Sequence, residues 1–307
     1  MTLETDLLLD RRRLKRRLVF WRSLTVAALV VAAVIGLRHA GLSVETDHLA
    51  RLNVTGAITD DRKLNQALIR LAANADTKAL IVSINSPGGT MSGGEALYRA
   101  IATVAEKKPV VAVMGGLAAS AGYMVAMPAQ RVFARESTIT GSIGVLLELR
   151  DLSALLDKVG IGTEAITSGA LKDQPNLTRP LTPRGREALQ DIVTDMFDQF
   201  VGMVAKGRQM DPVRVRLLAD GRAFTGRQAL ALGLIDQIGG EAEARAWLVS
   251  AKGVEAGLPV RDVTTGSLAS RTLGATLSEF VESIWKILIS QSVSLDGGMA
   301  VWQRSAD

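Results

Sequence analysis

Apolar residues recur along most of the chain in two spacings, which predict strands and helices in turn. Residues 79–84 and 109–114 are short, largely apolar runs rich in β-branched side chains, as is typical of strands buried on both faces of a sheet. Residues 48–58 predict a further strand, or a pair of short strands. Residues 60–74 have the spacing of an amphipathic helix, and a second helix is expected over 92–106. This alternation predicts an α/β domain.

Glycines follow two of the predicted strands. Residues 85–89 read Asn-Ser-Pro-Gly-Gly after the first apolar run and predict a turn. Gly115 and Gly116 follow the second run, and the next helix is expected to begin near Ser120. Glycines at such positions permit the close approach of a ligand to the backbone.

The N-terminal region carries most of the excess positive charge. The net charge is +5, but the chain is close to neutral once a cluster of basic residues is set aside, namely Arg11, Arg12, Arg13, Lys15, Arg16, Arg17 and Arg22. Such a run could be a nucleic-acid-binding tail. The apolar stretch that follows at once instead favours the positive-inside signal of a membrane protein, so no nucleic-acid partner is predicted.

Residues 18–37 form that apolar stretch, which is as long as the roughly 20 residues of a membrane-spanning helix. Arg22 and Trp21 lie near its basic end, where an arginine can reach the lipid headgroups. A cleaved signal peptide is the main alternative, but Arg38 would occupy a position at which cleavage needs a small residue. The sequence therefore predicts a cytoplasmic segment at 1–17, an uncleaved transmembrane helix at 18–37 and a body outside the cytoplasm.

The body is predicted to span residues 47–263, with a C-terminal extension at 264–307. The extension begins with a linker-like run of Thr, Gly and Ser, and residues 277–289 predict an amphipathic, strongly apolar helix. Packing within the core or an oligomer is the simpler interpretation of this helix. Lying on the membrane surface is the alternative.

The supply of titratable side chains narrows the chemistry. The chain has no Cys, which excludes a thiol nucleophile, a disulfide framework and a Cys-ligated metal. Its two histidines, His39 and His48, both lie close to the predicted anchor, so a Ser-His-Asp triad or a histidine-rich zinc site in the body is not expected. Acid–base chemistry then falls to Lys, Asp, Glu or Tyr.

Ser120 is a candidate nucleophile because a predicted strand enters a turn of small residues and a helix begins near this serine. The N–H of Ala121, at the start of that helix, would be free to bind an oxyanion. A second N–H could come from Gly89. The alternatives are an ordinary helix cap for Ser120 and a plain turn around Gly89.

Lys172 is a candidate general base. A lysine serves as a base when burial lowers its pKa, and Leu171 supplies an apolar neighbour. Most lysines lie in solvent, and spacing alone does not distinguish Lys172 from the others.

Taken together, these blocks resemble the signal peptide peptidase A (SppA) family in its half-length form. The resemblance covers residues 52–248 and rests on five blocks in the family's order, namely 85–89, 118–123, 140–145, 168–182 and 221–236. It implies a Clp/crotonase-like spiral of β-β-α units behind an N-terminal transmembrane helix. Two departures from the family's pattern are Ala121, where Gly is common, and Met124, where a second aromatic is common.

The resemblance also implies roles for individual residues. Ser120 would be the nucleophile and Lys172 the base, while the hydroxyl of Ser142 would position the lysine amine. The backbone N–H groups of Gly89 and Ala121 would form the oxyanion hole. The implied substrates are signal-peptide remnants and short or unfolded peptides, and the resemblance implies no metal or organic cofactor.

The implied setting is the bacterial inner (cytoplasmic) membrane, with the N-terminus in the cytoplasm. In double-length family members the serine and the lysine lie in different repeats, so this chain is expected to form a cyclic homo-oligomer that pairs Ser120 with a neighbour's Lys172. Two alternatives remain, a crotonase-like acyl-CoA enzyme and an inactive oligomeric scaffold.

Overall fold

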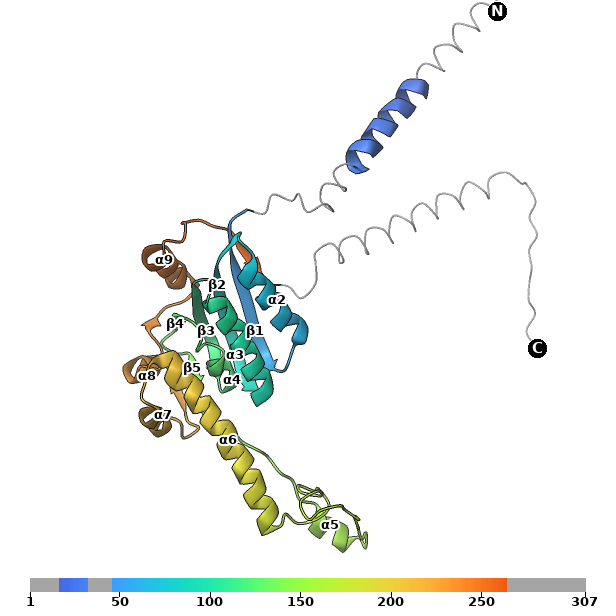
Figure 1. Cartoon of the computed structure of the whole chain (residues 1–307), viewed down its shortest axis with the longest axis vertical. Helices are drawn as coiled ribbons and strands as arrows, with labels where there is room; N and C mark the ends of the chain where they lie inside the picture. The colour runs from blue at the N-terminus through green and yellow to red at the C-terminus, as the bar shows by residue number, and fades with distance from the viewer. Residues whose placement is uncertain (1–16, 33–45, 264–307) are drawn as a thin grey trace, which may run out of the picture. The chain divides into compact units, whose positions relative to one another are not determined.

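The computed structural model describes residues 17–32 and 46–263 (Figure 1). The chain divides into two units, the first ending at Asp47 and the second beginning at His48. In the first unit, residues 17–32 form an exposed helix. Within the described residues, no helix is both long enough and apolar enough to cross a membrane. The rest of the predicted anchor, at 33–37, and the extension at 264–307 lie outside the described residues, so both stay predictions.

The second unit is a mixed α/β body built on one eight-stranded sheet, which confirms the α/β prediction. The main path of the sheet runs β6-β5-β3-β2-β1-β8, while β4 pairs with β3 and β7 pairs with β4. All pairs are parallel except β5 with β6. The strands are β1 (His48–Ile58), β2 (Thr77–Gly89), β3 (Val110–Ala119), β4 (Arg131–Ala134), β5 (Ile139–Gly141), β6 (Ala223–Thr225), β7 (Gln237–Ile238) and β8 (Val260–Asp262).

Helices cover both faces of this sheet. The helices of this unit are α2 (Arg62–Ala73), α3 (Met91–Ala105), α4 (Ala121–Met124), α5 (Ser153–Lys158), α6 (Pro183–Arg208), α7 (Pro212–Leu218), α8 (Gly226–Leu232) and α9 (Glu241–Lys252), of which α5 lies away from the sheet. Several begin at a Thr or Asp whose side chain accepts a backbone N–H of the first turn, as Asp61 does for α2 and Thr182 for α6. The helices predicted over 60–74 and 92–106 are confirmed as α2 and α3.

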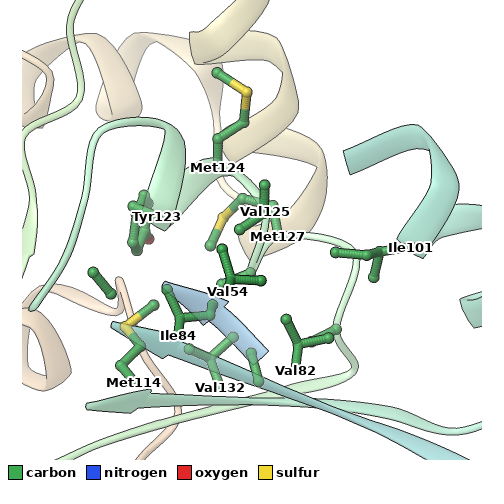
Figure 2. Packing of buried hydrophobic residues seen from close by; sticks show 14 of the residues in the cluster. Val54, Val82, Ile84, Ile101, Met114, Tyr123, Met124, Val125, Met127 and Val132 are labelled. Carbon is green, nitrogen blue, oxygen red and sulfur yellow. The ribbon is translucent and has the colours of Figure 1, made fainter. Parts of the chain in front are cut away.

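The runs at 79–84 and 109–114 are apolar because their strands, β2 and β3, are covered on both faces. In β2, Leu80, Val82 and Ile84 face the larger cluster under α2, α3 and α4. The intervening Ala79 and Ile81 face a second cluster, to which α9 contributes Ala244 and Leu248. Figure 1 shows α9 apart from α2 and α3, and Figure 2 shows side chains of the larger cluster packed between the strands and α4.

The turn predicted at 85–89 is wrong, because β2 continues to Gly89 and β3 continues to Ala119. Between the pairs Ile84↔Met114 and Ser86↔Ala118, β3 advances by four residues while β2 advances by two. The extra length is a bulge that contains Gly115 and Gly116. The Oδ1 atom of Asn85 accepts the N–H of Leu117 at 3.2 Å, so a side chain bridges the two strands within the bulge.

The bulge also divides the pairing of β3. Its first part, from Val111 to Met114, pairs with β4, whereas Leu117 to Ala119 pair with β5. The end of β3 is therefore held between β2 and β5, and the chain leaves it directly into α4.

An ion pair joins α6 to the loop after α8. Arg208 donates to both carboxylate oxygens of Asp236, at 2.8 and 2.9 Å, and Asp236 also accepts the N–H of Val132 in β4. The Arg208 side chain is only 8% exposed. Burial alone would raise the pKa of Asp236, but the hydrogen-bonded guanidinium outweighs burial and holds that pKa below its ordinary value.

We expect Asp236→Asn to lower the free energy of unfolding by about 3 kcal/mol, because it leaves the buried Arg208 charge uncompensated. Urea unfolding at pH 7 measures the loss. As a control, Asp262→Asn removes one of the two carboxylate partners of Arg51, in a half-exposed pair, and should cost less than about 1 kcal/mol.

The same pair has a pH signature. Since the folded-state pKa of Asp236 is lowered, its contribution is present above the unfolded pKa of about 3.9 and is lost as the pH falls through the folded value. The difference between wild type and Asp236→Asn should therefore shrink in acid. An equal loss for both variants at pH 7 would contradict a special role for the Arg208 pair.

Candidate active site

Ser120 lies between the end of β3 and the start of α4 in a rare backbone conformation. Its φ is 54° and its ψ is −123°, and it is one of three non-glycine residues with positive φ in the described part of the chain. Its N–H donates to the carbonyl of Gly141 at 2.9 Å, and its own carbonyl accepts the N–H groups of Tyr123 and Met124. The side chain makes no helix-capping hydrogen bond, so the ordinary-cap interpretation is wrong.

A serine in this conformation carries a cost of about 1 to 3 kcal/mol, and such residues cluster at functional sites. The sharp turn from strand to helix has the logic of a nucleophile elbow, which presents a hydroxyl at the end of a sheet. Ser120 is partly exposed, so its hydroxyl can be reached from solvent.

The end of β2 forms a close wall beside Ser120. Gly88 has a φ of +114°, and a Cβ there would lie 2.8 Å from the Ser120 Cβ and 3.2 Å from the Ala121 nitrogen. A Cβ on Gly89 would lie 1.9 Å from the carbonyl oxygen of Ile58 in β1. Both positions therefore need glycine, one because of Ser120 and the other because of the neighbouring strand.

Ala121 and Gly89 both lie beside the Ser120 turn, since Ala121 follows Ser120 and Gly89 follows Gly88. Ala121 is the first residue of α4, so its N–H has no acceptor inside the helix. The strands that lead to this turn end at the carboxyl edge of a parallel sheet, which is where ligands bind in α/β folds.

Ser142 lies next to Ser120 across the β3–β5 pairing. Ala119 pairs with Gly141, so the two serines follow paired residues of parallel strands. Ser142 also has positive φ, 49°, and its N–H donates to the carbonyl of Arg222 at 2.9 Å. The structure therefore brings together four of the five predicted site residues, namely Ser120, Ser142, Gly89 and Ala121.

Three buried hydroxyls support this edge, and none of them is among the predicted site residues. Ser86 accepts the N–H of Gly88 and donates to the carbonyl of Gly56 at 2.6 Å. Thr140 donates to the carbonyl of Ala118 at 2.8 Å, and Thr138 donates to that of Gly115. The sequence signal that could have identified these hydroxyls is their position in or beside the glycine-rich blocks. Backbone groups there lack regular strand partners and need a side chain to bond them.

Tyr123 follows Ser120 closely but is part of the core. Its ring is fully buried, and its hydroxyl donates to the carbonyl of Leu234 at 2.7 Å. Burial raises the pKa of this phenol well above its ordinary value. Tyr123 therefore stays protonated and holds α4 against the loop that carries Leu234. His48 is remote from the Ser120 turn. It begins β1 and lies roughly 30 Å along that strand from Ile58, the residue that contacts Gly89.

Lys172 is the predicted site residue that the single chain does not bring to Ser120. It is exposed, contrary to the expected burial, and lies in the segment 146–182. This segment, called the arm below, includes α5 and sits at the free end of α6, well apart from α4 in Figure 1. The core contacts of α6 begin at Phe197, about 15 residues from Thr182, which corresponds to roughly 22 Å along a helix.

The loop around Lys172 is tied firmly to the start of α6. The N–H of Lys172 donates to the carbonyl of Gly169 at 3.0 Å. Asp173 forms an ion pair with Arg179, and Gln174 accepts the N–H of Thr182 at 3.1 Å. The backbone at Lys172 is therefore held in place on the arm, far along α6 from the serine of its own chain.

The arm also exposes many large apolar side chains. Leu146 is 84% exposed and Ile166 is 99% exposed. The others are Leu147, Leu149, Leu152, Leu155, Val159, Ile161, Leu171 and Leu177. A concentration of apolar side chains of this size is typical of a protein-interaction surface.

Comparison with known proteins places this geometry in context. The sequence matches Peptidase family S49 over residues 102–255, a range that contains Ser120, Ser142 and Lys172. A Synechocystis protein provisionally named a protease is 40% identical over 67% of this chain and 75% of its own length. An Enterococcus faecium protein provisionally named signal peptide peptidase SppA is 32% identical over 76% of this chain and 72% of its own.

Protease 4 of Salmonella typhi is 34% identical over 53% of this chain but only 26% of its own length. Residues 50–140 also match the Clp protease family, in agreement with a Clp-like mixed α/β fold. Among solved structures, ClpP1 of Listeria monocytogenes is similar with a TM-score of 0.42 and 16% identity, over 62% of this chain and 91% of that one.

We expect Gly88→Ala to abolish reaction of Ser120 with a fluorophosphonate probe, or to slow it at least tenfold. The added Cβ would contact the Ser120 side chain, and positive φ disfavours alanine. Gly116→Ala is the matched control, because a Cβ there meets only the Asn85 Oδ1, at 3.7 Å. Similar labelling of both variants would show that Gly88 does not shape the serine turn.

Proposed function

Because this chain belongs to peptidase family S49 and is a serine-type peptidase of the SppA group, we propose that it is a membrane-anchored endopeptidase with a Ser–Lys dyad. Ser120 is the nucleophile, Lys172 the general base and Ser142 the residue that positions the lysine amine. The substrates are signal-peptide remnants and short or unfolded peptides. The observation that carries the proposal is the uncapped Ser120 in its strained turn, between Gly88 and Ser142.

The proposed reaction is acyl transfer through Ser120. Its hydroxyl oxygen attacks the peptide carbonyl while the neutral amine of Lys172 takes the proton. The N–H groups of Gly89 and Ala121 bind the oxyanion, and the protonated amine then gives its proton to the departing peptide amine. Water attacks the acyl-serine with Lys172 again as base, which releases the acid product and restores the serine.

The lysine in this proposal comes from a neighbouring copy of the chain. A dyad requires hydrogen-bonding distance between the two side chains, whereas the arm holds Lys172 at the far end of α6 from its own Ser120. The exposed apolar side chains of the arm supply a surface that a neighbour can cover. A head-to-tail contact of this kind closes into a ring, which is the proposed cyclic homo-oligomer.

Complementation tests the dyad and its assembly together. Ser120→Ala and Lys172→Ala should each lower peptide hydrolysis by a factor on the order of a thousand. When the two variants are unfolded, mixed in equal amounts and refolded, roughly a quarter of wild-type activity should return, because a random ring pairs an intact serine with an intact neighbouring lysine at one interface in four.

The matched control mixes Ser120→Ala with the double variant Ser120→Ala/Lys172→Ala, which has no intact serine and should stay inactive. Copies carrying different tags must copurify, so that mixed rings are known to exist. Mixed rings without returning activity would place the dyad within one chain. Near-normal turnover by Lys172→Ala alone would remove the lysine from the mechanism.

The anchoring part of the proposal rests on the N-terminal sequence. A basic cluster precedes the apolar stretch at 18–37, and residues 17–32 of this region are helical. With the basic end in the cytoplasm, the peptidase body lies outside the cytoplasm, in the bacterial inner membrane setting.

A reporter enzyme fused after Asp307 should therefore be active only when the reporter is one that works outside the cytoplasm. Protease added to spheroplasts should degrade the body and spare only the N-terminal region. A matched fusion after Arg17 reports the cytoplasmic side. Recovery of a mature chain that starts near Ala40 would instead establish a cleaved signal peptide.

A further inference from the structure

A groove of about 480 Å³ lies between the start of α3 and the middle of α6. Its residues come from one face of each helix. They are Met91, Ser92 and Glu95 from α3, and Asp191, Ile192, Asp195, Met196 and Gln199 from α6. Met91, Ile192 and Met196 make it apolar, while three carboxylates give it negative charge and no lining residue is cationic.

The groove is connected to the serine turn through α3. Gly94 of α3 packs on α4 so closely that a Cβ on it would lie 2.9 Å from the Ala121 Cβ. Met91 and Glu95 are within one helical turn of Gly94, and Ala121 directly follows Ser120. The helix that lines the groove therefore also packs on the element that follows Ser120, and we place the groove on the order of one helix diameter, about 10 Å, from the serine. An extended peptide covers that distance in about three residues.

The three carboxylates differ in how far they are already neutralised. Glu95 pairs with Arg99, which is itself 73% exposed. Asp195 accepts a hydrogen bond from Gln199 at 2.8 Å. Asp191 has no hydrogen-bond or ion-pair partner among the described residues. The negative charge of the groove is therefore available to a ligand, most of all at Asp191.

The chemistry of this groove suits a long cationic side chain. Lys and Arg combine an apolar stem with a charged end, which matches apolar walls beside carboxylates. A bare metal ion fits less well, since the described residues contain no group of three acidic or histidine side chains close enough to hold one.

We propose that this groove binds a Lys or Arg side chain of the peptide being cleaved, about three residues from the scissile bond, and so selects substrates that carry positive charge there. The inference rests on the proposed peptidase function. It assigns Asp191 and Asp195 as specificity-determining residues for a cationic, partly apolar peptide segment.

The test uses peptides that differ only in Lys, Gln or Glu at one position, scanned from the second to the fifth residue on each side of the scissile bond. At about the third position on one side, kcat/KM should be roughly fivefold higher for Lys than for Gln, and lower for Glu. The preference should shrink at about 1 M salt, which shortens the screening length.

D191N/D195N should remove the preference, and D191K/D195K should reverse it toward Glu. The matched control is E106Q/E255Q, which neutralises two exposed carboxylates outside the groove. Peptide binding to Ser120→Ala protein, followed by fluorescence anisotropy, should show the same order of Lys over Gln over Glu without any turnover.

Equal rates and equal binding for the three peptides at every position would overturn the groove assignment, as would a preference that survives D191N/D195N. A change of oligomer size in D191N/D195N would make the groove a contact between copies instead. Absence of Ser120-dependent cleavage of the Gln peptide would defeat the proposed peptidase function. In that case the anisotropy measurement alone decides whether the groove binds cationic peptides.

Discussion

The hydrogen bond from the Ser120 N–H to the Gly141 carbonyl is the interaction on which the site depends. It extends the β3–β5 pairing by one residue, so the chain can turn into α4 only through positive φ at Ser120. The cost of that conformation, about 1 to 3 kcal/mol, is offset by the four buried residues of α4. Position 88, which packs against Ser120, then needs glycine. The same strand pairing places Ser142 next to Ser120.

The sequence predicts this edge well because its signals are local. Apolar runs identify the buried strands, and the glycine-rich blocks identify the positions where backbones approach closely. The turn predicted at 85–89 fails for a reason that composition does not express. The side chains of Asn85, Thr138 and Thr140 bond to the bulged backbone, so the strands persist through residues that usually end them. Such bonds depend on which strands become neighbours, which is a property of the whole sheet.

The surroundings of Lys172 are the part that sequence could not supply. Its apolar neighbour Leu171 suggests burial, yet both residues are exposed because α6 carries the arm away from the body. The length of α6 beyond the core decides this, and nothing in the local sequence marks where its core contacts begin. Under the proposed assembly, the missing environment belongs to another copy. Catalytic competence would then depend on protein concentration, since association stabilises the only state in which the dyad exists.

This arrangement makes the rigidity of α6 a requirement of the proposed mechanism. The helix is anchored at its C-terminal half by Phe200, Val201 and Val204, and it holds the Lys172 loop at its other end. An error of a few degrees at the anchored end would move the lysine by more than 1 Å over roughly 22 Å, enough to break a proton-transfer contact. The Thr182 cap and the ion pair of Arg208 with Asp236 secure the two ends of the helix. Two of the three groove carboxylates, Asp191 and Asp195, lie on the same helix between those ends. A peptide bound there would therefore press on the element that positions the lysine for the neighbouring serine, so peptide binding and the alignment of that lysine would be coupled.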